Sequence, residues 1–132
     1  MLKRKLIVPV MLLLPMLAQA GAVDSLLETY RQAGAADFSA VQGETRWKQS
    51  NVDPKNGQSR SCSDCHTANL KQVGKHAKTG KKIDPMAPSV NPQRLTDAAK
   101  IEKWFKRNCN WTLGRACTPQ EKGDYLLYLR QQ

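Results

Sequence analysis

Five consecutive residues constrain this chain most: Cys62-Ser63-Asp64-Cys65-His66. The spacing C-x-x-C-H is the attachment signature of c-type haem, in which each thiol forms a thioether to one vinyl group. The histidine that follows is then held beneath the iron as an axial ligand. A C-x-x-C pair alone also suits zinc or thiol exchange, but zinc needs two further ligands at a second close spacing, and the sequence has no such pair. We therefore predict one haem c, attached through Cys62 and Cys65, with His66 on the iron.

The first twenty residues have the pattern of a secretory signal peptide. A positive start from Lys3 to Lys5 precedes an apolar stretch over residues 6–17 and the small-residue motif Ala18-Gln19-Ala20. This apolar run is too short for a membrane span of about 20 residues. We predict cleavage after Ala20, export to the periplasm and a single mature domain over residues 21–132, which is all that the length supports.

The chain is strongly basic, with a formal net charge of +10 at pH 7. Such a charge can serve nucleic-acid binding, but the aromatic residues are not interleaved with the basic ones as in single-strand binders. Export also takes the chain away from nucleic acid. We therefore expect no nucleic-acid partner and no membrane-spanning segment after cleavage. The positive surface is instead expected to steer the protein towards an acidic redox partner.

Two cysteines, Cys109 and Cys117, remain after the haem has taken its pair. An even remainder in an oxidising compartment usually forms a disulfide, which we expect here. The residues between them include Asn110, Trp111 and Gly114, a composition typical of loops. The bridge is therefore expected to tie the end of one helix to the start of the next.

The hydrophobic spacing predicts helices and loops, with no convincing strand. This pattern is typical of a small all-α domain, a class I-like cytochrome c with several short helices and long loops wrapped around one covalent haem. Gly43 and Trp47 are expected where the helix before the haem motif crosses the C-terminal helix. The predicted helices cover residues 23–33, Asp37 or Phe38 to Lys48, Asp97 to Asn108 with Thr96 as N-cap, and a last one after Thr118-Pro119-Gln120-Glu121; residues 50–61 and 67–95 are expected to be irregular.

The iron of a haem has a second axial position, for which the sequence offers three candidates. Electron-transfer cytochromes c usually place methionine there, and Met86 is the only methionine outside the predicted signal peptide. It lies only 20 residues after His66, which is a short path to the far face of a haem. The second candidate, His76, is the only other histidine, and its lysine-rich surroundings favour a place near the haem propionates.

Asn108 is the third candidate. Ile101, Trp104, Phe105 and Asn108 recur at helical spacing, so an asparagine belongs to the face that is expected to meet the core or the haem. A buried amide without a partner costs about 1–3 kcal/mol, so its place on this face needs a reason. The pattern alone favours C-capping of a helix that ends there. Ligation of the iron, or a hydrogen bond to an iron-bound ligand, is the alternative.

The chain resembles the sphaeroides haem protein family, whose members are small periplasmic c-type cytochromes that bind oxygen and other diatomic ligands. The resemblance is specific from Ser61 onward and weaker over residues 21–60. It rests on five groups of residues: Ser61 to Thr67; Gly74 to Lys81 with Pro85, Ala87 and Pro88; Glu102 to Cys109; Gly114 to Cys117; and Glu121 to Asp124.

The resemblance implies a particular role for Asn108 as the sixth ligand of ferric haem. On reduction it leaves the iron, which becomes five-coordinate and open to O2, NO or CO. An amide oxygen is a hard donor, which suits Fe(III) better than Fe(II). The resemblance also implies the Cys109–Cys117 disulfide, an electron-donating dihaem cytochrome c as partner, and often a membrane cytochrome b.

Two other functions stay open from the sequence. One is a plain electron carrier with His66 and Met86 on the iron. The other is a haem enzyme that turns over oxygen, peroxide or nitric oxide, which needs a distal acid–base group, and His76 is the only histidine available for it. We expect electron transfer and gas binding, and we assign no catalytic residue.

Overall fold

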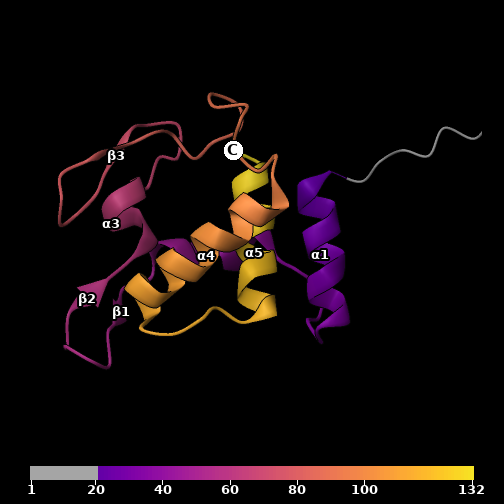
Figure 1. Ribbon diagram of the computed structural model, residues 1–132, viewed down its shortest axis with the longest axis horizontal. Coiled ribbons are helices and arrows are strands. Elements are labelled where there is room, and N and C mark those ends of the chain that lie inside the picture. The colour runs from indigo at the N-terminus through magenta and orange to yellow at the C-terminus, as the bar shows by residue number, and fades with distance from the viewer. Residues whose placement is uncertain (1–20) are drawn as a thin grey trace, which may run out of the picture.

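The computed structural model describes residues 21–132 (Figure 1). The predicted signal peptide and its cleavage site lie outside these residues. Four of the described helices were expected, and the haem motif itself forms a fifth, short one. The helices are α1 (Ala22–Gln32), α2 (Ala40–Lys48), α3 (Cys62–His66), α4 (Ala98–Leu113) and α5 (Pro119–Arg130). None of them is long and apolar enough to cross a membrane.

The absence of strands was a wrong prediction, because two small antiparallel pairs are present. β1 (Asn51–Val52) pairs with β2 (Ser59–Arg60), and β3 (Gly74–Lys75) pairs with β4 (Lys82–Ile83). Strands of two residues leave no alternation of polar and apolar residues in the sequence. The β1–β2 pair is set up by the turn between the two strands. In this turn Asp53 Oδ1 accepts from the Lys55 amide at 2.8 Å, and Gly57 has a φ of 70°.

The crossing of α2 and α5 lies where the sequence placed it. A Cβ atom on Gly43 would collide with the backbone carbonyl of Asp124, so only glycine lets the two helices approach this closely. Trp47, one turn further along α2, is buried at the same crossing and packs against Tyr125 and Tyr128 of α5. Helices α2 and α5 therefore form a tightly packed pair at the centre of the Trp47 cluster.

Helix α5 begins as predicted, and α2 begins slightly later than expected. Thr118 accepts a hydrogen bond from the Glu121 amide at 3.2 Å while the Glu121 carboxylate accepts from the Thr118 amide at 2.8 Å. The predicted start of α2 at residue 37 or 38 moves to Ala40 because Ser39 caps it, with its hydroxyl accepting from the Gln42 amide.

Helix α4 differs from the prediction at both ends. Its N-cap is Asp97 rather than Thr96, with the carboxylate accepting from the Lys100 amide at 2.9 Å. Its last helical residue is Leu113, five positions beyond the predicted end at Asn108, and Gly114 closes it in the left-handed conformation with a φ of 69°. The C-capping interpretation of Asn108 is therefore wrong, and so is the loop expected directly after Cys109.

The elements separate into two regions along the molecule. Figure 1 shows α1 at one end and α3 with the two strand pairs at the other, with α4 and α5 between them. One buried cluster joins α1 to α4 and α5 through Leu26, Leu27, Ile101 and Leu126. A second cluster, centred on Trp47, lies on the side of α3 and of the segment 67–96.

Candidate haem-binding site

The described structure contains a cavity of about 940 Å³ beside the C-x-x-C-H helix. Its size lies in the upper part of the range for ligand and cofactor sites. Elements far apart in the sequence line it, namely α3, the segment 76–96, α4 and α5. Every residue that the sequence proposed for the haem or its iron lines this one cavity: Cys62, Cys65, His66, His76, Met86 and Asn108.

The short helix α3 sets the geometry of the motif. Asp64 accepts a hydrogen bond from the Ser61 amide at 2.6 Å and so fixes the first turn. Cys62 and Cys65 are three residues apart on this turn, which places them on the same face. Both thiols are free, and both line the cavity. Two thiols on one face, followed by a histidine, match the donors that a covalently attached haem needs.

The Cys62 thiol is not set up for exchange chemistry. Burial raises the pKa of the Cys62 thiol to about 11, although a hydrogen bond with Tyr125 acts in the opposite direction. Reactive cysteines require a lowered pKa, because the thiolate is the nucleophile. A buried and protonated thiol at neutral pH favours structural or attachment chemistry over a thiol–disulfide oxidoreductase.

His66 is placed as a ligand to something in the cavity. Its Nδ1 is buried and has no hydrogen-bond partner within residues 21–132. Its Nε2 is not among the buried atoms without a partner. Burial, with a smaller contribution from the charge of Arg94, lowers the pKa of His66 to about 4. The imidazole is therefore neutral at physiological pH, which is the form that binds metals. These features fit a haem iron bound through Nε2.

The β3–β4 hairpin covers one side of the motif. A Cβ atom on Gly74 would collide with the carbonyl group of Cys65, so the backbone of β3 presses directly on α3. The Ala77 amide donates to the Cys65 sulfur at 3.4 Å. The hairpin therefore forms a close-fitting wall of the cavity next to the second thiol.

Asn108 lies in the middle of α4 and is half-buried. The predicted stripe is real, because Ile101, Trp104, Phe105 and Asn108 all line the cavity. The Asn108 amide makes none of the side-chain hydrogen bonds found in residues 21–132, whereas the nearby Asn110 donates to the Lys106 carbonyl at 2.6 Å. An unpaired amide facing a cavity is a donor group available to a ligand.

The two other candidate ligands are less well prepared. The Nδ1 atom of His76 accepts from the Lys78 amide at 3.2 Å and from the Thr79 amide at 3.1 Å. In the neutral imidazole its proton therefore sits on Nε2, which leaves no free lone pair for a metal. Met86 lines the cavity and packs against the Trp47 cluster, so its thioether stays a possible ligand on position alone.

A disulfide joins Cys109 to Cys117, with Cα atoms 5.5 Å apart. Cys117 directly precedes Thr118, the N-cap of α5. The bridge therefore ties α4 to the start of α5, as expected, but from within the helix rather than from its end. Because Cys109 follows Asn108 in the chain, the bridge also limits movement of the backbone that carries Asn108.

Sequence reasoning missed one wall of the cavity. The Arg60 guanidinium lies 3.8 Å from the ring centroid of Trp111 and donates to its carbonyl at 2.8 Å. The Asp53 carboxylate holds the same guanidinium at 3.3 Å. The Trp111 ring also lies next to His76, with centroids 5.8 Å apart and an interplanar angle of 43°. No local sequence pattern predicts this arrangement, because Arg60, His76 and Trp111 come from three distant segments.

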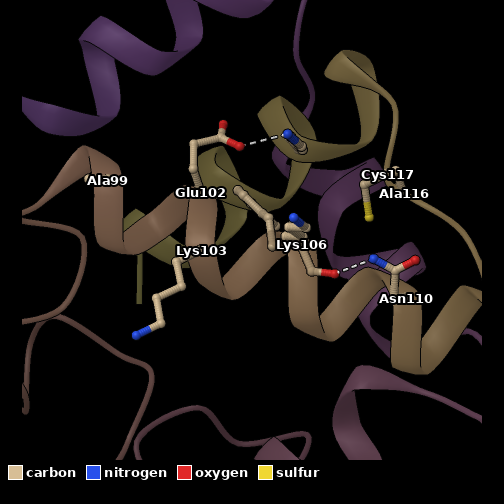
Figure 2. A pocket seen from close by; sticks show the side chains of 9 residues that line it. Ala99, Glu102, Lys103, Lys106, Asn110, Ala116 and Cys117 are labelled. Atoms are coloured by element: carbon tan, nitrogen blue, oxygen red, sulfur yellow. Dashed lines mark hydrogen bonds and ion pairs between the residues drawn. The ribbon is translucent and has the colours of Figure 1, made fainter.

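A smaller hollow of about 530 Å³ lies along another face of α4 (Figure 2). The Glu102 carboxylate there accepts from Lys122 Nζ at 2.7 Å, so its charge is already paired. Of the residues proposed from the sequence, only Cys117 lines this hollow. The large cavity beside α3 is therefore the candidate site.

A family model described as a domain of unknown function, DUF1924, matches residues 33–129. The chain is also 40% identical to the cytochrome c-type protein SHP of Cereibacter sphaeroides, over 98% of this chain and 98% of that protein. The chain belongs to the SHP family of c-type cytochromes. The predicted resemblance to the sphaeroides haem protein family is thereby confirmed.

Solved structures of SHP relatives have the same fold. The structure of oxidised SHP, described as an oxygen-binding cytochrome c, aligns with a TM-score of 0.74 at 39% identity, over 83% of this chain and 96% of that one. Oxidised cytochrome c'' from Methylophilus methylotrophus aligns with a TM-score of 0.71 at 34% identity, over 84% and 94% of the two chains. The predicted small all-α cytochrome c fold is confirmed, and haem c is the cofactor of this SHP-family chain.

Proposed function

We propose that this protein is a periplasmic monohaem c-type cytochrome in which Asn108 is a displaceable sixth ligand. It accepts and donates electrons, and it binds the diatomic gases O2, NO and CO. The observation that carries this proposal is the position of Asn108, which lies within α4, on the cavity wall, and joins no side-chain hydrogen bond of residues 21–132. Its amide is therefore available to a ligand in the cavity.

The chain supplies three fixed groups and one mobile group. Cys62 and Cys65 hold the haem covalently, and His66 binds the iron through Nε2. The haem supplies an iron that changes by one electron and takes small ligands when ferrous. Asn108 offers an amide oxygen, which is a hard donor that prefers the ferric state. With haem bound, Asn108 would leave the iron on reduction, and a diatomic ligand could then bind there.

The movement required is a rotation of the Asn108 side chain. Helix α4 continues to Leu113, so the backbone at Asn108 stays within the helical hydrogen-bond ladder. The Cys109–Cys117 bridge restrains the same segment from its other side. A change of rotamer costs little and needs no refolding, which suits a ligand that must leave and return with each electron.

The partner class follows from the redox role and the charge. We infer that the electron donor is a dihaem cytochrome c, which in turn receives electrons from a membrane cytochrome b. Basic side chains from the segment 76–96 and from α4 line the cavity, and most of them are exposed, so we call them its basic mouth: Lys81, Lys82, Arg94, Lys100 and Arg107. A negatively charged docking face on the donor complements this surface.

Optical and resonance Raman spectra of the purified protein test the proposal. They are recorded for the ferric and ferrous states, each with and without carbon monoxide. A ferrous state that is high-spin, five-coordinate and readily shifted by carbon monoxide supports a displaceable ligand. A low-spin ferrous spectrum that does not change when carbon monoxide is added overturns the proposal.

One observation favours a second function, a plain electron carrier with His66 and Met86 on the iron, because Met86 lines the cavity. Replacement of Met86 by alanine separates the two functions. A carrier of this kind loses its low-spin ferrous spectrum in the variant, whereas the Asn108 mechanism leaves the spectrum unchanged. An enzymatic role is less well supported, because His76 has its Nδ1 engaged by two backbone amides.

A further inference from the structure

The residue that directly follows His66 has a strained backbone. Thr67 has a φ of 66° and a ψ of 164°, a region that glycine adopts freely and that side-chain-bearing residues avoid. Thr67 is β-branched, which makes the conformation still less favourable. A backbone of this kind persists only where the surrounding structure holds it in place.

Trp47 supplies that hold. Its indole Nε1 donates a hydrogen bond to the Thr67 carbonyl oxygen at 3.2 Å, across 20 residues of sequence. The Thr67 amide donates in turn to the Ser63 carbonyl at 2.9 Å, so the strained residue is fastened at both its amide and its carbonyl. The end of the haem motif is thereby attached to α2.

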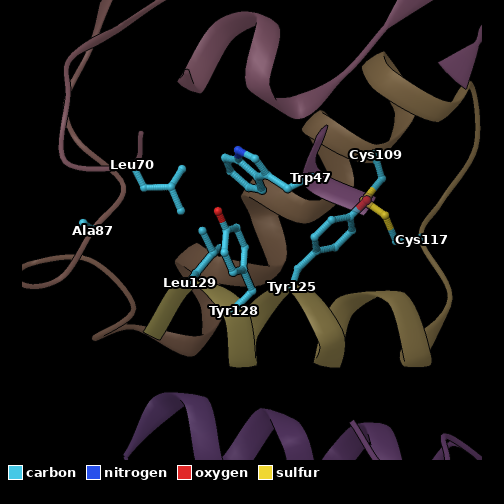
Figure 3. Packing of buried hydrophobic residues seen from close by; sticks show 8 residues of the cluster. All are labelled: Trp47, Leu70, Ala87, Cys109, Cys117, Tyr125, Tyr128 and Leu129. Atoms are coloured by element: carbon cyan, nitrogen blue, oxygen red, sulfur yellow. A yellow bond between two sulfur atoms is a disulfide. The ribbon is translucent and has the colours of Figure 1, made fainter. Parts of the chain in front are cut away.

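The Trp47 ring also backs the histidine itself. The ring centroids of Trp47 and His66 are 5.4 Å apart, with an interplanar angle of 43°. Trp47 is only 5% exposed, and Tyr125 and Tyr128 pack against it, each at 6.3 Å between centroids. Figure 3 shows Trp47 among these tyrosines and Leu129. The tight α2–α5 crossing at Gly43 keeps the whole group from shifting.

Within the described part of the chain, no hydrogen bond at Nδ1 orients the His66 ring. A metal-bound histidine usually donates its second ring nitrogen to a carbonyl or carboxylate, which fixes the plane of the ring. The Nδ1 atom of His66 has no such partner within residues 21–132. The orientation of the ring must therefore come from the helix α3, from the Thr67 backbone and from the Trp47 ring.

We propose that Trp47 is the positioning residue of His66. It fixes the imidazole plane through the Thr67 carbonyl and through ring contact, in place of a hydrogen bond at Nδ1. The inference rests on the proposed function only in that His66 binds the iron. Its consequence is an asymmetry between the axial ligands: His66 is held by a rigid aromatic wall, and the ligand that leaves on reduction is the unpaired Asn108.

The test reads the plane of the histidine directly. Proton NMR of the ferric cyanide adduct gives hyperfine-shifted haem methyl signals, whose spread depends on the orientation of the axial imidazole. Cyanide occupies the sixth position in every variant, so the result does not depend on which residue normally sits there. The variants are Trp47→Phe, which keeps an aromatic ring but lacks the N–H, and Trp111→Phe as the matched control from the same cavity.

We expect Trp47→Phe to change the spread of the haem methyl signals relative to the wild type. The change caused by Trp111→Phe should be clearly smaller. Equal spreads in the wild type and Trp47→Phe overturn the proposal, as does an equally large change in Trp111→Phe. If Trp47→Phe fails to fold, 3-benzothienylalanine at position 47 keeps the bicyclic shape without the N–H, and the same comparison applies. A pyridine haemochrome spectrum of the wild type reports separately whether the haem is attached, so failure of the proposed function is distinguishable.

Discussion

Asn108 lines the haem cavity directly before Cys109, whose sulfur is bonded to Cys117 at the start of α5. The two neighbours on α4 thus differ in mobility. The side chain of Asn108 joins no side-chain hydrogen bond of residues 21–132, whereas Cys109 is 5% exposed and covalently fixed. If Asn108 is the displaceable ligand, the fixed Cys109 beside it confines the motion to one side chain.

Replacement of Asn108 by alanine should open the ferric iron. If the asparagine contributes about 1.4–2.8 kcal/mol as an internal ligand, its removal raises the ferric affinity for azide or imidazole about 10–100-fold. Optical titration measures this affinity, together with an increase of the high-spin ferric signal. Asn110→Ala is the matched control, because Asn110 is exposed on the same helix and bonded to the Lys106 carbonyl. Identical ferric spectra for the wild type and Asn108→Ala would falsify the ligand assignment.

Loss of the disulfide should weaken both the fold and the ligand. In the double variant Cys109→Ser with Cys117→Ser, we expect the free energy of unfolding to fall by about 2–3 kcal/mol, because a short cross-linked loop is released. The low-spin ferric fraction should also fall, since the backbone at Asn108 gains freedom. Guanidinium denaturation and ferric optical spectra measure the two effects. Unchanged stability and an unchanged spin state would contradict the restraining role of the bridge.

The basic mouth of the cavity should govern encounters with anions. Charge reversal at Lys81 and Lys82, both of which line the cavity, is expected to slow oxidation of the ferrous protein by ferricyanide about threefold to tenfold at low salt. Stopped-flow measurements across ionic strengths should also show a flatter salt dependence. Lys55→Glu is the control, because this exposed lysine lies in the β1–β2 turn, away from the mouth. An equal slowing in the control would point to net charge rather than to this surface.

Glu121 should make the fold sensitive to acid. Hydrogen bonds from Arg115, opposed by burial and helped by the Thr118 amide, hold the pKa of Glu121 below its usual value. A carboxylate with a lowered folded-state pKa stabilises the protein above its unfolded-state pKa of about 4.3, and the benefit disappears as the pH falls through the folded-state value.

Glu121→Gln should therefore lower the free energy of unfolding by about 1–2 kcal/mol at pH 7. The gap between variant and wild type should close as the pH falls below about 4. Denaturation at a series of pH values measures it, with Glu28→Gln on the exposed face of α1 as control. A gap that is independent of pH would show that the Glu121 charge does not contribute.

Much of this architecture is legible in the sequence because it depends on local signals. The start of α5 was predictable from its capping residues. The α2–α5 crossing was predictable from Gly43 and Trp47, and the disulfide from the number of cysteines. The cavity-facing stripe of α4 was also predictable, because helical spacing places Ile101, Trp104, Phe105 and Asn108 together. The roles of the haem-attachment residues and of Asn108 stay predictions.

What the sequence could not give depends on tertiary contacts. Asn110, Trp111 and Thr112 are weak helix formers, so the sequence indicated a loop where α4 continues. Trp111 is held there by Arg60, 51 residues away, and Thr112 is buried. The two-residue strands were missed because turns, rather than alternating side chains, create them. The Trp47–Thr67 hydrogen bond likewise joins two segments that no local rule connects.

The contact between Gly74 and Cys65 bears on how the protein is made. In the folded chain the β3 backbone presses on the Cys65 carbonyl, and the Ala77 amide reaches the Cys65 sulfur. The hairpin and a group attached at Cys65 would therefore share one small space, so folding of the hairpin and chemistry at this thiol would depend on each other.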